Sequence, residues 1–88
     1  MYKVVITRKA EKGYNKLIEY REQINRVLDL LETVPYPSKE YSLKKLCGSD
    51  AYRIRVGKVR IKYFIVKEKK EIVVYNIELR SDSTYKRG

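Results

Sequence analysis

The chain of 88 residues is long enough for one domain with one small hydrophobic core, and we expect residues 1–88 to form that domain. Its 21 lysines and arginines outnumber 11 acidic residues, and the formal net charge of +10 indicates a polyanionic partner. With no histidine and one cysteine, Cys47, an internal disulfide and a histidine-activated nucleophile are excluded, and too few ligands remain for zinc. We expect a cytoplasmic protein without metal or cofactor. We expect no membrane segment either, since the apolar runs are short and the start does not resemble a secretory signal.

The first half of the chain predicts a strand followed by two helices. Residues 2–7 are rich in β-forming side chains, and Thr7 is suited to cap the start of a helix. Apolar residues then recur at helical spacing, which predicts helices over residues 8–19 and 21–33. The Pro-Tyr-Pro sequence at residues 35–37 ends the second helix, because proline supplies no backbone N–H.

The second half predicts short strands joined by turns. Residues 41–46 form a strand candidate, residues 47–50 a turn and residues 52–63 a hairpin. A polar turn at residues 67–70 separates this hairpin from the β-rich residues 71–79. Consecutive hairpins pair antiparallel, and two helices can cover only one face of a sheet. We therefore expect an α+β fold, in which an N-terminal strand precedes a two-helix hairpin packed on one face of a four- to five-stranded, mainly antiparallel twisted sheet.

The hairpin at residues 52–63 is the most informative segment, because apolar and cationic residues alternate strictly on both sides of its turn. A two-residue loop that begins with Gly57 fits a tight turn and fixes the register of the two strands. In that register the apolar side chains share one face of the hairpin. The opposite face receives two pairs of cations, which are Arg53 with Lys62 and Arg55 with Arg60.

The two cation pairs predict an anion site, because like charges directly opposite each other destabilise a sheet. A hairpin that sets cation against cation twice is therefore expected to bind an anion on that face. The alternative is a solvated basic face without a ligand, although unliganded surfaces more often mix the two signs of charge.

With this order of elements the chain resembles the RelE/ParE superfamily of toxins, and the RelE branch more than the ParE branch. The resemblance covers nearly the whole length. It rests on the Leu-Lys-Lys-Leu string at residues 43–46 with Gly48 behind it, on the basic hairpin at residues 52–63, and on Ile77 and Arg80 with Tyr85 and Lys86 behind them.

The resemblance implies the toxin of a toxin–antitoxin pair, a metal-independent endoribonuclease that cuts mRNA in the ribosomal A site. In that family the 2′-hydroxyl attacks the adjacent phosphate and leaves a cyclic phosphate and a free 5′-hydroxyl. The residues that match the family's catalytic positions are Arg53, Arg55, Arg60, Arg80 and Tyr85. The cations expected to bind the RNA backbone are Lys44, Lys45 and Lys62. The implied partners are ribosome-bound mRNA and a small cognate antitoxin.

Two departures from the family pattern bear on the chemistry. Some relatives have lysine where this chain has arginine at positions 53 and 55. Arginine keeps its proton, so it cannot act as a general base, but it binds phosphate bidentately and stabilises charge on the phosphate oxygens. Four residues separate Arg80 from Tyr85, one more than in the usual family ending. Tyr85 remains open as a proton acceptor and can instead stack on a base, and Lys62 or Glu78 can share the acid–base work.

Simpler roles compete for several of these residues. Tyr85 can pack over the sheet edge, and Arg80 can pair with a nearby carboxylate. Lys44 and Lys45 can protect an edge strand from aggregation. For the whole chain, the rival functions are a ParE-like toxin that inhibits a topoisomerase and a catalytically silent module that binds RNA or ribosomes. Cleavage of ribosome-bound mRNA separates the three functions.

Overall fold

The computed structural model describes residues 1–46 and 50–79. Their elements run in the order β1 (Lys3–Ile6), α1 (Arg8–Lys16), a 3-10 turn (Ile18–Tyr20), α2 (Arg21–Thr33), β2 (Ser42–Lys45), β3 (Ala51–Val56), β4 (Val59–Val66), a second 3-10 turn (Lys67–Lys69) and β5 (Glu71–Leu79). Every predicted strand and helix is present. The first helix ends three residues earlier than predicted, and β4 continues three residues beyond the predicted end of the hairpin.

The helix α1 begins at its predicted cap and ends early. Thr7 Oγ1 accepts a hydrogen bond of 3.3 Å from the Ala10 backbone N–H, as expected of an N-cap. The helix ends at Lys16 and not at residue 19, because Leu17 leaves the helical region with φ −100° and ψ 52°. With 9 residues in α1 and 13 in α2, neither described helix is long and apolar enough to cross a membrane.

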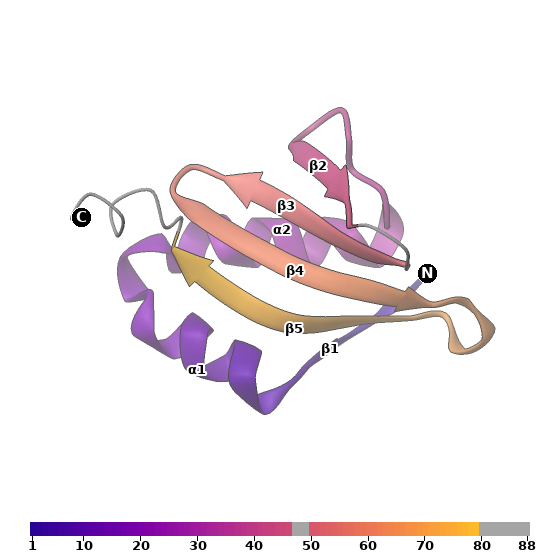
Figure 1. The fold of residues 1–88 in the computed structure, drawn as a ribbon, viewed down its shortest axis with the longest axis horizontal. Coiled ribbons are helices and arrows are strands. Elements are labelled where there is room, and N and C mark those ends of the chain that lie inside the picture. The colour runs from indigo at the N-terminus through magenta and orange to yellow at the C-terminus, as the bar shows by residue number, and fades with distance from the viewer. Residues whose placement is uncertain (47–49, 80–88) are drawn as a thin grey trace.

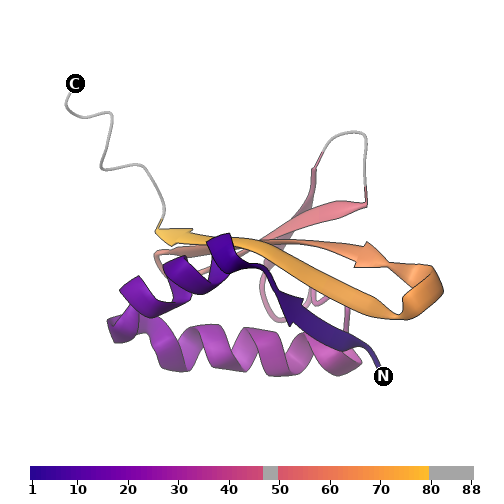
Figure 2. The ribbon, with the colours of Figure 1, turned by 90° about the horizontal axis from the view of Figure 1, so that it is seen from below.

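The five strands form one sheet in the order β1-β5-β4-β3-β2, as Figure 1 shows. The strand β1 pairs parallel with β5, and the other neighbours pair antiparallel, which confirms the expected mainly antiparallel sheet. Both helices lie on the same side of the sheet (Figure 2), so the predicted α+β architecture is correct. No described helix covers the other side, which is here called the open face.

The core lies between the helices and the sheet. Fully buried side chains of α2 and of the central strands form it, and these include Ile24, Val27, Leu31, Ile54, Ile61 and Tyr63. The Tyr63 hydroxyl donates a hydrogen bond of 2.7 Å to the Pro35 carbonyl oxygen. Burial raises the pKa of Tyr63 above its usual range, so this hydroxyl keeps its proton.

Gly13 sets the distance between α1 and the sheet. A Cβ at this position would collide with the backbone carbonyl of Ile77 on β5. The helix can therefore lie close to β5 only because this residue has no side chain.

The hairpin of β3 and β4 has the predicted turn and register. Gly57 has φ +58°, in the left-handed region that glycine adopts at little cost. The pairs are Tyr52 with Tyr63, Arg53 with Lys62, Ile54 with Ile61, Arg55 with Arg60, and Val56 with Val59. All five pairs match the sequence prediction.

A bulge in β5 was not predicted. Tyr75 is its extra residue, because Lys62 pairs with Asn76 whereas the next residue of β4 pairs with Val74. Since Val74 is buried in the core, strict alternation would direct Asn76 and Glu78 toward the core as well. The bulge reverses the alternation, so both of these polar side chains belong to the open face.

Candidate phosphate-binding site on the open face

Four cations from β3 and β4 gather on the open face, and they are here called the cationic cluster: Arg53, Arg55, Arg60 and Lys62. Strand pairing sets Arg53 beside Lys62 and Arg55 beside Arg60. All four side chains are partly buried. Because their neighbours along each strand point into the core, alternation directs the cations to the side without helices.

Glu78 of β5 brings a carboxylate to the cluster. Its Oε2 lies 3.8 Å from Arg60 Nη1 and 3.5 Å from Lys62 Nζ. Its Oε1 accepts a hydrogen bond of 2.9 Å from Asn76 Nδ2, which fixes the carboxylate in place. The side chains of Arg60, Lys62 and Glu78 are 24%, 28% and 36% exposed, so water weakens these ion pairs in part. The hairpin alone presents only cations, and β5 supplies a counter-charge.

Two guanidinium groups of the cluster keep donors without acceptors. The Nε atoms of Arg55 and Arg60 are buried and have no hydrogen-bond partner in the described part of the chain. Among the same residues, no carboxylate comes within ion-pair distance of Arg55. A buried donor left unpaired costs about 1–3 kcal/mol. A bound phosphate would accept from these donors and would reduce the repulsion between the paired cations.

The other predicted cations are divided between the faces. Lys44 of β2 pairs with Arg53, so it extends the cluster along the open face. Lys45 pairs with Tyr52, which packs against the core, so Lys45 belongs to the opposite face and is not part of the cluster. Arg80 and Tyr85 lie outside the described residues, and their assigned roles stay predictions.

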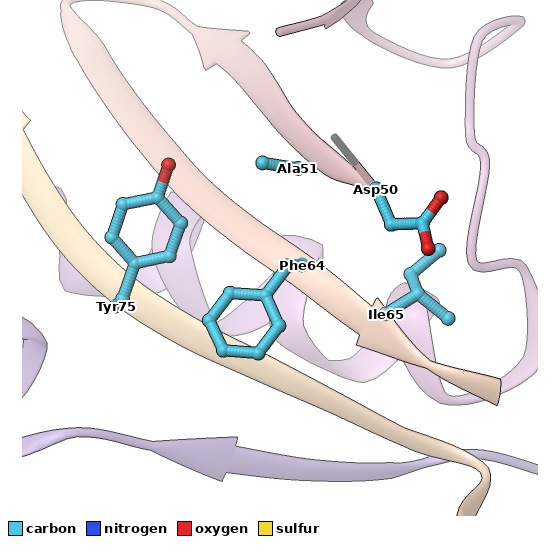
Figure 3. Close-up of a pocket in the computed structure, with 5 residues that line it drawn as sticks. All are labelled: Asp50, Ala51, Phe64, Ile65 and Tyr75. Atoms are coloured by element: carbon cyan, nitrogen blue, oxygen red, sulfur yellow. The ribbon is translucent and has the colours of Figure 1, made fainter. Parts of the chain in front are cut away.

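An aromatic pair lies beside the cluster on the same face. The ring centroids of Phe64 on β4 and Tyr75 on β5 are 5.7 Å apart, with their planes at 34°. Phe64 is 37% exposed, although most apolar residues of β4 are buried. The two rings border a hollow of about 450 Å³, shown in Figure 3 and here called the aromatic hollow. Its lining residues are Asp50, Ala51, Phe64, Ile65 and Tyr75.

The sequence did not reveal the aromatic pair, and it did not assign Glu78 to a face of the sheet. The signal for both was an irregular spacing: Val74 and Ile77 are both buried, yet they are three residues apart. Strict alternation forbids that spacing on one face, whereas a bulge between them restores it. The alternation of β4 also continues one step beyond Lys62 to Phe64, where an aromatic ring replaces the next cation on the open face.

The arrangement can bind and stabilise negative charge. Guanidinium groups offer paired donors to phosphate oxygens, and these contacts strengthen when charge builds up during a reaction. Among residues 1–46 and 50–79, no three histidine, cysteine or acidic side chains gather in a way that could hold a metal ion.

Comparison with known proteins identifies relatives that share this sheet and its helices. No family model matches the chain. The candidate toxin RelE1 of Methanocaldococcus jannaschii is 32% identical over 66 residues, which cover 74% of this chain and 72% of that protein.

Solved structures of RelE proteins have the same fold. A chain of the archaeal RelE–RelB complex from Pyrococcus horikoshii OT3 has a TM-score of 0.82 at 27% identity, with 92% of this chain and 97% of that chain covered. A chain of the intact E. coli RelBE toxin–antitoxin complex has a TM-score of 0.75 at 25% identity, with 90% and 96% covered. These matches confirm the RelE-like fold over nearly the whole chain.

Proposed function

Because this chain belongs to the RelE family of toxins, we propose that it is the toxin of a toxin–antitoxin pair and cuts mRNA in the ribosomal A site. The observation that carries the proposal is the cationic cluster, in which cations oppose cations on a sheet face that no described helix covers. The buried Nε donors of Arg55 and Arg60 add a need for acceptor oxygens at the same place. The phosphates of RNA supply both the negative charge and the acceptors.

The proposed reaction is an internal attack within the RNA. The 2′-hydroxyl gives up its proton, and its oxygen attacks the adjacent phosphorus. The bond from phosphorus to the 5′ oxygen breaks, and this oxygen takes up a proton. The products are a 2′,3′-cyclic phosphate and a free 5′-hydroxyl. No metal is required in this scheme, because the guanidinium groups of the cluster stabilise the charge on the non-bridging oxygens.

The residues divide into binding and chemical roles. Arg55 and Arg60 hold the phosphate under attack, since the Nε donors of both are buried and have no acceptor among the described residues. The cations that flank this phosphate and bind the neighbouring backbone are Lys44, Arg53 and Lys62. By resemblance to the family, Arg80 adds a further guanidinium, and Tyr85 accepts a proton or stacks on a base.

In the absence of phosphate, the carboxylate of Glu78 serves as the anion that pairs with the cluster. Its carboxylate contacts Arg60 and Lys62 and is held by Asn76. A phosphate that approaches these two cations must therefore compete with the carboxylate. The carboxylate can also accept the proton of the 2′-hydroxyl, a role that arginine cannot perform. Positioning by the ribosome then compensates for a weak base, because orientation alone lowers a barrier by several kcal/mol (about 7 or more in well-oriented cases).

The proposed partner is a small antitoxin. The structural relatives include a chain of an archaeal RelE–RelB complex and a chain of the E. coli RelBE toxin–antitoxin complex. For this chain, an antitoxin segment with acidic residues would neutralise the positive charges of the open face in the absence of RNA. The same segment would exclude phosphate from the cluster.

Primer extension on translated mRNA tests this function. With the protein present, we expect new 5′ ends at codons that occupy the A site, and 3′ ends that carry a cyclic phosphate. The same mRNA without ribosomes should stay intact. Equal cutting of free mRNA would contradict ribosome dependence. The absence of cutting in both samples, together with unimpaired translation, would contradict the toxin function and favour a silent RNA-binding module.

A further inference from the structure

The aromatic hollow lies beside the proposed phosphate site and has no part in the proposed cleavage. We propose that it holds one base of single-stranded RNA, next to the nucleotide whose phosphate binds the cationic cluster. The inference rests on the proposed function, because it requires RNA on the same face of the sheet.

Strand geometry sets the hollow and the cluster side by side. Ala51 pairs with Phe64, and Arg53 pairs with Lys62, so the two cross-strand pairs follow each other on the open face. Two residues of a strand span about 7 Å. That separation is on the scale of one nucleotide, so one RNA strand can reach both sites without a loop.

The bulge brings the second ring into place. Without it, residue 75 would lie opposite Lys62, in the position that Asn76 holds. The extra residue moves Tyr75 toward Phe64, and bulges commonly redirect a side chain in this way. The platform is thus built into the backbone of β5.

The two rings offer flat surfaces to a ligand. Figure 3 shows both rings with their faces turned outward from the open side of the sheet. Since their planes are tilted by 34° at a centroid distance of 5.7 Å, they form one continuous platform and not two parallel walls. Bases stack on such aromatic faces largely irrespective of sequence.

The surrounding charges select the occupant. Asp50 borders the hollow at the end away from Tyr75 (Figure 3), and a carboxylate repels phosphate. The cations Lys62 and Arg53 lie two residues further along their strands, on the same face. A ligand that lies across both parts must therefore carry a flat uncharged ring beside a negative charge. A single-stranded nucleotide has this composition, because its base is exposed and its phosphate is charged.

The experiment uses short single-stranded RNA in which 2′-O-methyl groups prevent cleavage. One base of this RNA is replaced by 2-aminopurine, whose fluorescence falls when it stacks on another ring. In the wild-type protein, we expect quenching at one position of the RNA. Phe64→Ala should abolish the quenching and weaken binding about 5- to 100-fold. Phe64→Tyr should restore both, whereas Phe64→Leu should not, because leucine keeps apolar area without an aromatic face.

Three comparisons separate the possible outcomes. Ile18→Ala removes an apolar side chain that is 67% exposed on the helical side, and it should leave quenching and affinity unchanged. An abasic nucleotide at the quenched position should weaken wild-type binding and remove the effect of Phe64→Ala. The salt dependence of binding should stay the same in Phe64→Ala, since no phosphate contact is lost, but should decrease in Arg55→Ala.

The inference is overturned if no position is quenched, or if Phe64→Leu binds RNA as tightly as the wild type. It is also overturned if Phe64→Ala affects only the binding of a co-expressed antitoxin, because the hollow would then dock protein. In each of these cases salt-dependent RNA binding and cleavage of ribosome-bound mRNA can persist, so the proposed function survives separately. Loss of cleavage in the wild type, with quenching retained, contradicts the function and not the base site.

Discussion

The two halves of the open face lie on the same strands and differ in what their side chains require of a ligand. In the cationic cluster, the Nε donors of Arg55 and Arg60 are buried and have no acceptor in the described part of the chain, so a bound anion would supply acceptors that the fold there does not. In the aromatic hollow, the rings of Phe64 and Tyr75 already pack against each other, and the faces of the rings need no polar partner. In the proposed function, the cluster therefore binds RNA through charge, whereas the hollow offers it a surface for stacking.

Because of this difference, the contributions of the two halves to RNA binding can be measured separately. Charge interactions weaken as salt screens them, but stacking of apolar rings is much less sensitive to salt. The contacts of Glu78 with Arg60 and Lys62 link the cluster to β5, the strand that also carries Tyr75. Changes that act on one half and leave the other intact therefore test whether the two halves bind different parts of a nucleotide.

The largest expected effect comes from Arg60→Ala, which removes a central guanidinium of the cluster. If Arg60 stabilises the charge that develops on phosphate, cleavage of ribosome-bound mRNA should fall about 100-fold or more. Ribosome binding and the quenching of 2-aminopurine should persist, because the hollow is unchanged. Single-turnover cleavage and co-sedimentation with ribosomes measure the two effects. An equal loss of binding and cleavage would make Arg60 a docking residue.

The next effect is the dependence of RNA binding on salt. If the cluster and Lys44 together neutralise about three or four phosphates of a single strand, affinity should fall about 20- to 50-fold between 50 and 200 mM salt. Fluorescence anisotropy with a labelled, uncleavable RNA measures this slope. An affinity that is independent of salt in this range would contradict an electrostatic site, whatever the state of the hollow.

A smaller effect is expected from Glu78→Gln. The amide keeps the shape of the side chain and can still accept from Asn76, but it removes the charge that competes with phosphate. Because the ion pairs of Glu78 are partly exposed, anion affinity should rise only about two- to fivefold. Titration with inorganic phosphate and with uncleavable RNA measures this change. Weaker phosphate binding in this variant would show that Glu78 organises the cluster instead of competing with its ligand.

The cationic half could be predicted from the sequence because a single local rule determines it. A two-residue turn that starts at Gly57 fixes the register, and alternation then assigns each side chain between residues 52 and 63 to a face. The helices were also predictable from the spacing of their apolar residues. The end of α1 was not, because the chain leaves the helix at Leu17 to pass through the 3-10 turn that leads into α2.

The aromatic half depended on a feature that local rules do not provide. Phe64 and Tyr75 meet only because β5 gains one residue against β4, and the placement of Glu78 follows from the same bulge. Pairing between strands decides where a bulge forms, so the spacing of Val74 and Ile77 in the sequence does not by itself locate one. Lys45 was grouped with Lys44 by sequence, but adjacent strand residues lie on opposite faces.

The most direct test of the central claim compares two arginines of equal charge on opposite sides of the molecule. Arg55 lies in the cluster, whereas Arg26 lies on α2 with a side chain that is 69% exposed. We measure the single-turnover cleavage rate of ribosome-bound mRNA for Arg55→Ala and Arg26→Ala, after melting curves show that both are folded. Arg55→Ala should cut about 100-fold more slowly than the wild type, and Arg26→Ala should cut at the wild-type rate. Equal rates for the two variants would contradict a phosphate-binding role for the open face.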